Sequence, residues 1–269
     1  PKFNICDVDI CLTWEDKYDK LYPWNYICGG STVNTSFDIV YDEKNNLTLD
    51  IYESGGEKDA LFIYFHGGGL ETGSKQAASS FAEALCCKGI DVASVEYRMY
   101  PAAKFPEFIE DCAAACAFIM GKYGYKRHYI GGSSAGAYLS MMLAFDKSYL
   151  GKYSIDADDI DGYVLDAGQP TTHFNILRER GIDTKAIRVD EAAPIYFIDS
   201  KPEKTSRYLI FIAERDISCR LEQNYMLKRT MLDFGYPEEC IRLEYMEGYG
   251  HCGYIKDEVF PETIADFIG

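Results

Sequence analysis

Strand-like and helical patterns alternate along most of the sequence, and this alternation is the feature that most restricts the fold. Eight apolar runs have the length of strands, at residues 37–42, 47–53, 61–66, 91–97, 127–133, 162–168, 207–214 and 241–247. The middle runs are almost continuously apolar, as strands buried on both faces of a parallel sheet are. Helical patterns occur at about residues 75–88, 107–121, 135–146, 220–234 and 256–268. The order predicts an α/β domain with a mostly parallel sheet.

We expect residues 1–269 to form a single domain, because no repeat or linker interrupts this pattern. The first two runs are close together and are predicted to form an antiparallel hairpin at one edge of the sheet. Residues 169–206 form a connection longer than is usual between a helix and a strand, which indicates an insertion folded over one end of the sheet. Residues 1–30 are rich in aromatic side chains. We expect this segment and the insertion to cover the active site as a short cap.

The formal net charge is −16, with 43 acidic and 27 basic residues. Such a field repels nucleic acid and anionic membrane surfaces and favours neutral small molecules as partners. No apolar run approaches the roughly 20 residues that a membrane span requires. The ten cysteines form no C-x-x-C pair, so buried free thiols are expected rather than a metal site or a disulfide framework. These features favour a cytoplasmic protein, and a leader removed before Pro1 stays open.

A glycine-bracketed turn, GGSSAGAYLS at residues 131–140, joins the fifth apolar run to a helical pattern. It fits the spacing G-x-S-x-G with Ser134 at the centre, whereas centring the motif on Ser133 puts Ala135 where the second glycine belongs. Small neighbours permit a strained bend that exposes the serine hydroxyl, and the helix N-terminus behind it offers N–H groups to a negative charge. The alternative is an ordinary strand-to-helix turn with serine as the N-cap.

A serine hydroxyl becomes a good nucleophile when a base removes its proton. His251, on a glycine-flanked loop after the last run, is the expected base, ahead of His173, which is expected to be exposed or a helix cap. Asp216, just after the seventh run, is the expected acid that orients the base, with Asp166 and Glu214 as alternatives. Such loops follow the C-terminal ends of strands, where parallel sheets carry their sites.

The third run leads into a glycine-rich stretch, HGGGLETGS at residues 66–74. Glycines let the backbone approach a substrate closely, and we expect the N–H groups of Gly68, Gly69 and Ala135 to form an oxyanion hole. No lysine follows in the register of a phosphate-binding loop. The order of glycine stretch, G-x-S-x-G, aspartate and histidine predicts acyl transfer through Ser134 with neither metal nor cofactor.

These motifs resemble the α/β-hydrolase superfamily and, within it, the hormone-sensitive-lipase-like esterases. HGGGLETGS is similar to the HGGG signature of that group, VEYRMYPAAKFPEFIED at 95–111 to its Y-R-L-x-P…F-P…E-D stretch, and the serine turn to its G-D-S-A-G elbow, with Ser133 replacing the usual aspartate. The likeness extends over about residues 35–269. It implies an α/β-hydrolase fold with an eight-stranded, mostly parallel sheet flanked by helices. It also implies cofactor-free carboxylester hydrolysis by Ser134, His251 and Asp216, with Gly68, Gly69 and Ala135 around the oxyanion.

We therefore expect a serine carboxylester hydrolase that acts on small, neutral, short-acyl esters of the acetyl type, with acetylated sugars among the candidate substrates. The size and loop pattern also resemble bacterial acetyl esterases. A serine peptidase of the prolyl-oligopeptidase type shares the Ser…Asp…His order, but this sequence has no room for its propeller. The other alternative is a ligand-binding domain of this fold without catalysis, although such domains commonly lose the base or the nucleophile and this sequence contains both.

Overall fold

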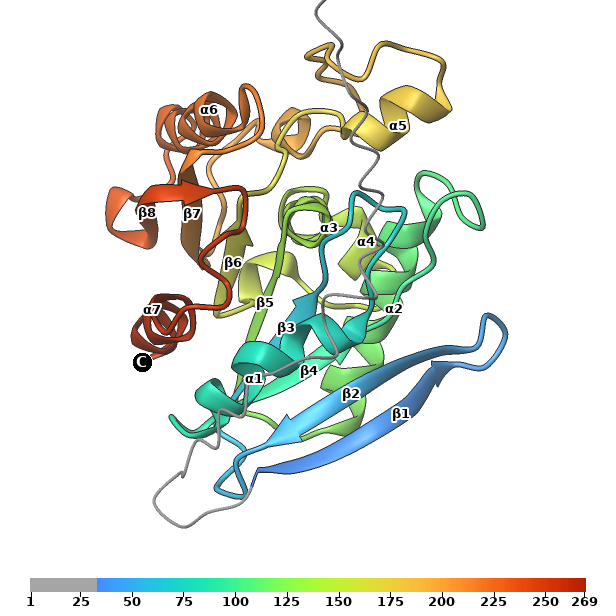
Figure 1. Cartoon of the computed structure of the whole chain (residues 1–269), viewed down its shortest axis with the longest axis vertical. Coiled ribbons are helices and arrows are strands. Elements are labelled where there is room, and N and C mark those ends of the chain that lie inside the picture. Colours follow the sequence, from blue (N-terminus) through green and yellow to red (C-terminus); the bar gives the residue numbers. More distant parts are fainter. Residues whose placement is uncertain (1–32) are drawn as a thin grey trace, which may run out of the picture.

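The computed structural model describes residues 33–269, and its strands form one eight-stranded sheet in the order β1-β2-β4-β3-β5-β6-β7-β8 (Figure 1). The first two strands form an antiparallel hairpin, and β2 also pairs antiparallel with β4, whereas every other pair is parallel. The strands are β1 Asn34–Asp42, β2 Leu47–Glu53, β3 Ala60–Phe65, β4 Ile90–Val95, β5 Arg127–Ser133, β6 Gly162–Asp166, β7 Arg207–Arg215 and β8 Ile241–Gly250. The predicted mostly parallel sheet with an antiparallel edge hairpin is confirmed.

Helices cover both faces of the sheet, and the side chains of β3 show how the core divides between them. Leu61, Ile63 and Phe65 belong to the cluster on the face of α2, α3, α4 and α6. Phe62 and Tyr64 belong to the cluster on the face of α1 and α7. Because successive side chains of a strand point to opposite faces, this alternation buries β3 completely. The helices are α1 Ser79–Cys86, α2 Glu107–Lys122, α3 Ala135–Phe145, α4 Ser148–Gly151, α5 Phe174–Glu179, α6 Arg220–Asp233 and α7 Val259–Ile268.

Two helical patterns are shorter in the structure than in the sequence prediction. The pattern at 75–88 starts as a 3₁₀ turn, Lys75–Ala78, before α1. The last helix begins at Val259 rather than at 256. Pro261 then falls in the first turn of α7, where a missing backbone N–H breaks no helical hydrogen bond. The sequence analysis did not predict α4 and α5, whose four and six residues are too few to show a period.

The insertion at 169–206 carries α5 and lies against the parts of the fold that surround the serine turn. The ring of Phe174 lies on the glycine stretch, so that a Cβ atom added to Gly69 would be 2.9 Å from its Cζ. The hydroxyl of Tyr138 in α3 donates to the carbonyl of Ala192, 2.9 Å away. The insertion is therefore fixed to both the glycine stretch and the helix behind the serine. The aromatic segment 1–30 lies outside the described residues.

The cysteines differ in one respect from the prediction of free thiols. Six of the described cysteines are free, namely Cys86, Cys112, Cys116, Cys219, Cys240 and Cys252. Cys87 is disulfide-bonded, so the prediction is wrong for this residue. Cys87 is half-buried at the end of α1, where its sulfur can meet a partner, whereas its neighbour Cys86 points into the core. No helix within residues 33–269 is long and apolar enough to cross a membrane.

Candidate active site

Ser134 occupies a strained bend between β5 and α3. Its backbone has φ 54° and ψ −109°, a conformation that a residue with a Cβ rarely adopts. The bend is held by two backbone hydrogen bonds, from Ser134 N to the carbonyl of Asp166 at 2.7 Å and from Tyr138 N to the carbonyl of Ser134 at 3.0 Å. This is the geometry of a nucleophile elbow, in which the serine side chain stands free at the end of the sheet.

The two glycines of the motif explain why its spacing is fixed. A Cβ atom on Gly132 would be 2.5 Å from the carbonyl carbon of Gly136. A Cβ atom on Gly136 would overlap the carbonyl oxygen of Phe65 at the end of β3. The first turn of α3 is thus pressed against β3 and β5, and a side chain at either position would move Ser134. The structure therefore supports the alignment centred on Ser134 rather than on Ser133.

His251 and Asp216 lie next to this serine although they are far from it in the sequence. His251 directly follows β8, and its Nε2 is 2.8 Å from the Oγ of Ser134. Its Nδ1 is 2.5 Å from the Oδ1 of Asp216, which directly follows β7. An ionised carboxylate only accepts hydrogen bonds, so the histidine proton is on Nδ1 and Nε2 is free to accept from the serine. The three residues expected from the sequence are thus joined in one chain of hydrogen bonds.

The carboxylate of Asp216 is well shielded and held from a second side. Its side chain is 1% exposed, compared with 23% for His251. Its Oδ1 also accepts from the backbone N–H of Ile217 at 2.6 Å. A carboxylate held in this way stabilises an imidazolium that forms beside it.

The glycine stretch runs beside the serine and presents unused donors. A Cβ atom on Gly67 would be 3.4 Å from the Cβ of Ser134. Gly68 and Gly69 have φ of 115° and 66°, which glycine adopts without strain. Within the part of the chain that the structure describes, the backbone N–H groups of Gly68, Gly69 and Ala135 have no acceptor. These three donors fit the expected oxyanion hole.

His66 supports the glycine stretch from behind, a role that the sequence analysis did not assign. Its ring stacks on Tyr97 with centroids 4.4 Å apart, and the Tyr97 hydroxyl donates to the His66 carbonyl at 2.8 Å. Its Nδ1 lies 2.7 Å from the carbonyl of Gly67. Both residues occur in motifs that the sequence analysis quoted, but their contact joins β3 to the segment after β4 and is not visible in either motif.

The alternative site residues take part in other hydrogen bonds than those of Ser134 Oγ and the His251 ring. His173 is buried as the N-cap of α5, where its Nδ1 accepts from Asn175 N at 3.2 Å, so the prediction of a capping role is confirmed and that of exposure is wrong. Burial, together with the nearby charge of Arg220, holds the pKa of His173 well below its usual value. Asp166 accepts from Tyr254, and Glu214 accepts from Gly248 N at 2.6 Å.

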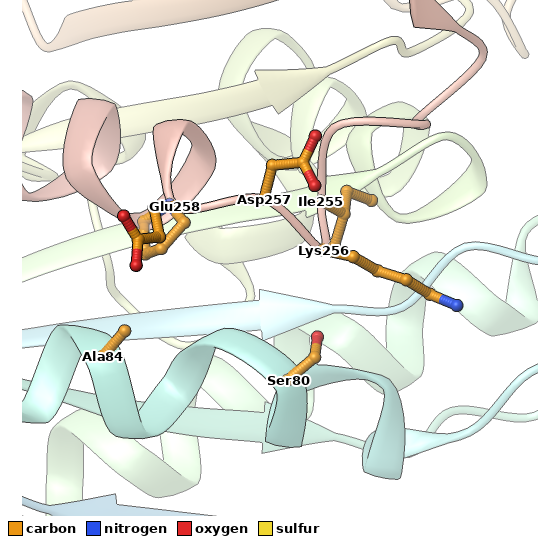
Figure 2. Close-up of a pocket in the computed structure, with 7 residues that line it drawn as sticks. Ser80, Ala84, Ile255, Lys256, Asp257 and Glu258 are labelled. Atoms are coloured by element: carbon orange, nitrogen blue, oxygen red, sulfur yellow. The ribbon is translucent and has the colours of Figure 1, made fainter. Parts of the chain in front are cut away.

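A shallow hollow lies between α1 and the start of α7 (Figure 2). None of the residues around Ser134 lines it. The hollow is formed by Ser80, Ala84, Ile255, Lys256, Asp257, Glu258 and Pro261. Among residues 33–269 there is no group of three or more histidine, cysteine or acidic side chains arranged to hold a metal ion.

Comparisons with known proteins agree with the fold. The family model described as BD-FAE matches residues 49–164, which include the glycine stretch and Ser134. Probable carboxylesterase 1 from Arabidopsis thaliana is 31% identical over 140 residues, 43% of this chain and 44% of that protein. The acetyl esterase of Salmonella paratyphi B is 28% identical over 127 residues, 45% of this chain and 39% of that protein. The chain thus spans less than half the length of these two relatives.

Solved structures share the fold over nearly the whole described chain. The truncated form of a carbohydrate esterase from gut microbiota superposes with a TM-score of 0.72 at 21% identity, covering 88% of this chain and 95% of that one. An esterase from Thermogutta terrifontis superposes with a TM-score of 0.65 at 18% identity, covering 90% and 92%. Sheet order, elbow geometry and the solved structures therefore agree, and the chain has the α/β-hydrolase fold.

Proposed function

We propose that the protein is a serine carboxylester hydrolase that works through an acyl-enzyme on Ser134. The observation that carries this proposal is the chain of hydrogen bonds at 2.8 Å and 2.5 Å from Ser134 through His251 to Asp216. It begins at a serine in the strained elbow conformation, which a simple helix cap does not require. The carboxylesterase and acetyl esterase among the relatives support the same reaction class.

The reaction follows from the positions of these groups. His251 Nε2 takes the hydroxyl proton as Ser134 Oγ attacks the ester carbonyl carbon. The carbonyl oxygen becomes an oxyanion, which accepts hydrogen bonds from the N–H groups of Gly68, Gly69 and Ala135. The imidazolium, stabilised by Asp216, then gives its proton to the leaving alcohol. Water attacks the acyl-enzyme by the same route and releases the acid, so that the side chains and backbone supply every proton transfer.

We propose a small, neutral substrate with a short acyl group of the acetyl type. The ring of Phe174 lies against Gly69 at the glycine stretch, which limits the space beside the acyl carbon. The net charge of −16 disfavours anionic esters. A similar solved structure is described as a carbohydrate esterase and a relative as an acetyl esterase, which supports an acetylated sugar as a candidate alcohol.

A fluorophosphonate probe and two serine variants test the proposed reaction. We expect the probe to label Ser134, and Ser134→Ala to lower turnover by roughly 10⁶-fold, as loss of a nucleophile does in serine hydrolases. Ser133→Ala is the neighbouring control and should still be labelled. Absence of labelling in the folded wild type would favour the alternative of a ligand-binding domain, and labelling of Ser133 would overturn the assignment.

Esters of increasing acyl length test the substrate class separately. We expect kcat/KM for p-nitrophenyl esters to fall from acetate to octanoate, because Phe174 crowds the glycine stretch. Phe174→Ala should relieve this selectivity and raise the relative rate on longer esters. A kcat/KM that rises with chain length in the wild type would contradict a short-acyl site.

We further propose that residues 1–269 act as one domain whose partner is a small ester rather than nucleic acid or a membrane surface. The contacts of the insertion with Gly69 and Tyr138 support this organisation. The cytoplasmic location also remains a proposal. Six free thiols are typical of a reducing compartment, whereas the disulfide at Cys87 is typical of an oxidising one. The mass of the alkylated, unreduced protein from its natural source distinguishes the two.

A further inference from the structure

A second carboxylate, Asp166, is buried directly behind the proposed site. It is the last residue of β6, it has no exposed surface, and it pairs in register with Ser133 at the end of β5. The hydroxyl of Tyr254, which is also fully buried, donates a short hydrogen bond to Asp166 Oδ1. The Ser133 hydroxyl and the Cys252 thiol lie beside the same carboxylate. A buried carboxylate with three such neighbours needs an explanation, because its desolvation destabilises the fold.

The neighbours of Asp166 belong to two different loops of the site. Ser133 immediately precedes the nucleophile, and the backbone carbonyl of Asp166 accepts from Ser134 N at 2.7 Å. Cys252 and Tyr254 come one and three residues after His251. Asp166 therefore connects the two loops. Its backbone carbonyl binds the turn of the nucleophile, and its side chain binds the loop that carries the base.

His251 is the cationic side chain that interacts electrostatically with the Asp166 carboxylate. No arginine or lysine forms an ion pair with it in the described part of the chain. Burial raises the pKa of Asp166 to about 6, while Ser133, Tyr254, His251 and Cys252 act to lower it. Further out, Asp216 and Arg220 face the Cys252 thiol from the loop after β7 and from α6. At neutral pH the carboxylate is therefore mostly ionised, and among the groups that act on it protonated His251 carries a positive charge that it can stabilise.

We propose that Asp166 is a positioning residue for the reaction, which ties the loop of the base to the turn of the nucleophile and adds a second negative charge behind His251. This inference rests on the proposed esterase function. Asp166 touches no reacting atom and acts through His251. Its part differs from that of Asp216, which holds the Nδ1 proton of the imidazole directly.

Asp166→Asn tests the electrostatic part of this role. The amide keeps the shape of the side chain and removes the charge, so the imidazolium loses a stabilising neighbour. We expect the acid limb of the kcat/KM profile to move to lower pH, by up to roughly one unit. The limiting kcat should fall about tenfold. A residue with a merely structural role would lower activity without moving this limb.

Tyr254→Phe should have a smaller effect in the same direction. It keeps the carboxylate but removes its donor, so the pKa of Asp166 rises and part of the charge is lost in the pH range of the acid limb. The acid limb should then also move to lower pH, by less than in Asp166→Asn. This variant also decides the matter if Asp166→Asn does not fold, since an acid limb that stays where it is in Tyr254→Phe would overturn the proposal.

Asp91→Asn is the matched control. Asp91 is another buried aspartate that accepts from a tyrosine hydroxyl, Tyr125, at 2.8 Å. It lies near the start of β4, at the end of the sheet opposite to the serine, and should leave the acid limb unchanged.

Proton NMR of the His251 ring gives a readout that needs no substrate, since the chain has four histidines. We expect the signal of the Nδ1 proton of His251 to shift in Asp166→Asn and to stay in place in Asp91→Asn. If the wild type hydrolyses esters but Asp166→Asn shifts neither this signal nor the acid limb, the positioning role is wrong and the esterase function stands. If the wild type neither hydrolyses esters nor reacts with a fluorophosphonate, the esterase function fails, and the positioning role fails with it.

Discussion

Ser134 adopts a backbone conformation that destabilises the chain locally, and the surrounding residues make it tolerable. A non-glycine residue at a φ of 54° costs on the order of 1–3 kcal/mol, so the surrounding fold must hold it there. Gly132 and Gly136 provide the room, and the hydrogen bond to Asp166 fixes the bend. The strained bend is therefore held by residues that take no part in proton transfer.

Gly136→Ala should distort this bend. The added methyl group would overlap the carbonyl oxygen of Phe65, and we expect a loss of about 1–3 kcal/mol in the free energy of unfolding together with a large loss of turnover. Gly121→Ala is the matched control. It lies in α2 with open space around the new atom, and should stabilise the protein by up to about 1 kcal/mol. Denaturant unfolding and ester hydrolysis measure both effects, and equal stability of the two variants would contradict the predicted crowding.

Asp216→Asn should impair the base without unfolding the protein. The amide can donate to Nδ1 and so favours the wrong tautomer of His251, and turnover should fall by about 10⁴-fold, as in serine proteases. Glu214→Gln is the control, since Glu214 accepts from Gly248 N rather than from the imidazole. A larger loss in Glu214→Gln than in Asp216→Asn would reverse the assignment.

The sequence predicted some site residues better than others. Those that it predicted are marked by a pattern in their own segment of the chain. Ser134, Asp216 and His251 each come shortly after an apolar run, so their place at the C-terminal end of a parallel strand could be predicted. The contacts of Asp166 with Ser133, Cys252 and Tyr254 join three separate strand ends. No spacing within one segment encodes such a contact, and the sequence showed Asp166 only as an alternative to Asp216.

At the scale of elements, the edge hairpin anchors the segment that follows the glycine stretch. Lys75 begins the 3₁₀ turn there and is 4% exposed. Its Nζ lies 2.5 Å from the Oδ1 of Asp50 in β2 and 2.5 Å from the Oδ1 of Asp38 in β1. Lys75 N also donates to Glu96 at 3.1 Å, and Glu96 faces His66. A chain of charged and polar groups thus runs from the edge of the sheet to the back of the expected oxyanion hole.

Lys75→Met should test this anchor. The variant leaves the Asp50 carboxylate buried without its counter-charge, and the free energy of unfolding should fall by about 3–5 kcal/mol. Asp38→Asn removes the outer partner, whose side chain is 78% exposed, and should cost less than about 1 kcal/mol. Chemical denaturation measures the free energy of unfolding of both variants. Similar losses in the two would mean that Lys75 does not anchor this segment.

The sequence predicted best those elements in which buried, apolar positions recur regularly along the chain. The runs of β3, β4 and β5 are covered on both faces, so nearly every position is apolar. The insertion has no such repeat, because α5 has only six residues and is held by single contacts such as that of Phe174 with Gly69. Its place near the serine follows from tertiary contacts, which the sequence pattern does not contain.

At the scale of the whole molecule, the charge of −16 should act on substrate encounter rather than on the reaction itself. We expect kcat/KM for an anionic acetyl ester to rise with ionic strength, since salt screens its repulsion from the protein. A neutral acetyl ester of similar size is the control and should show little change. Equal salt dependence of the two esters in steady-state kinetics would mean that the field near Ser134 differs from that of the whole protein.

Residues 169–206 occupy one uninterrupted stretch between β6 and β7, whereas the reacting side chains come from loops after β5, β7 and β8. Recombination at just two points, near Gly168 and Ser206, could therefore exchange the segment that carries Phe174 between related genes and leave Ser134, Asp216 and His251 in place. Gly168 would have to be retained at the first junction, because a Cβ atom there would collide with Ala137 and Met141 of α3. For the proposed esterase, the choice of ester could thus be inherited as a single module, separately from the ability to cleave it.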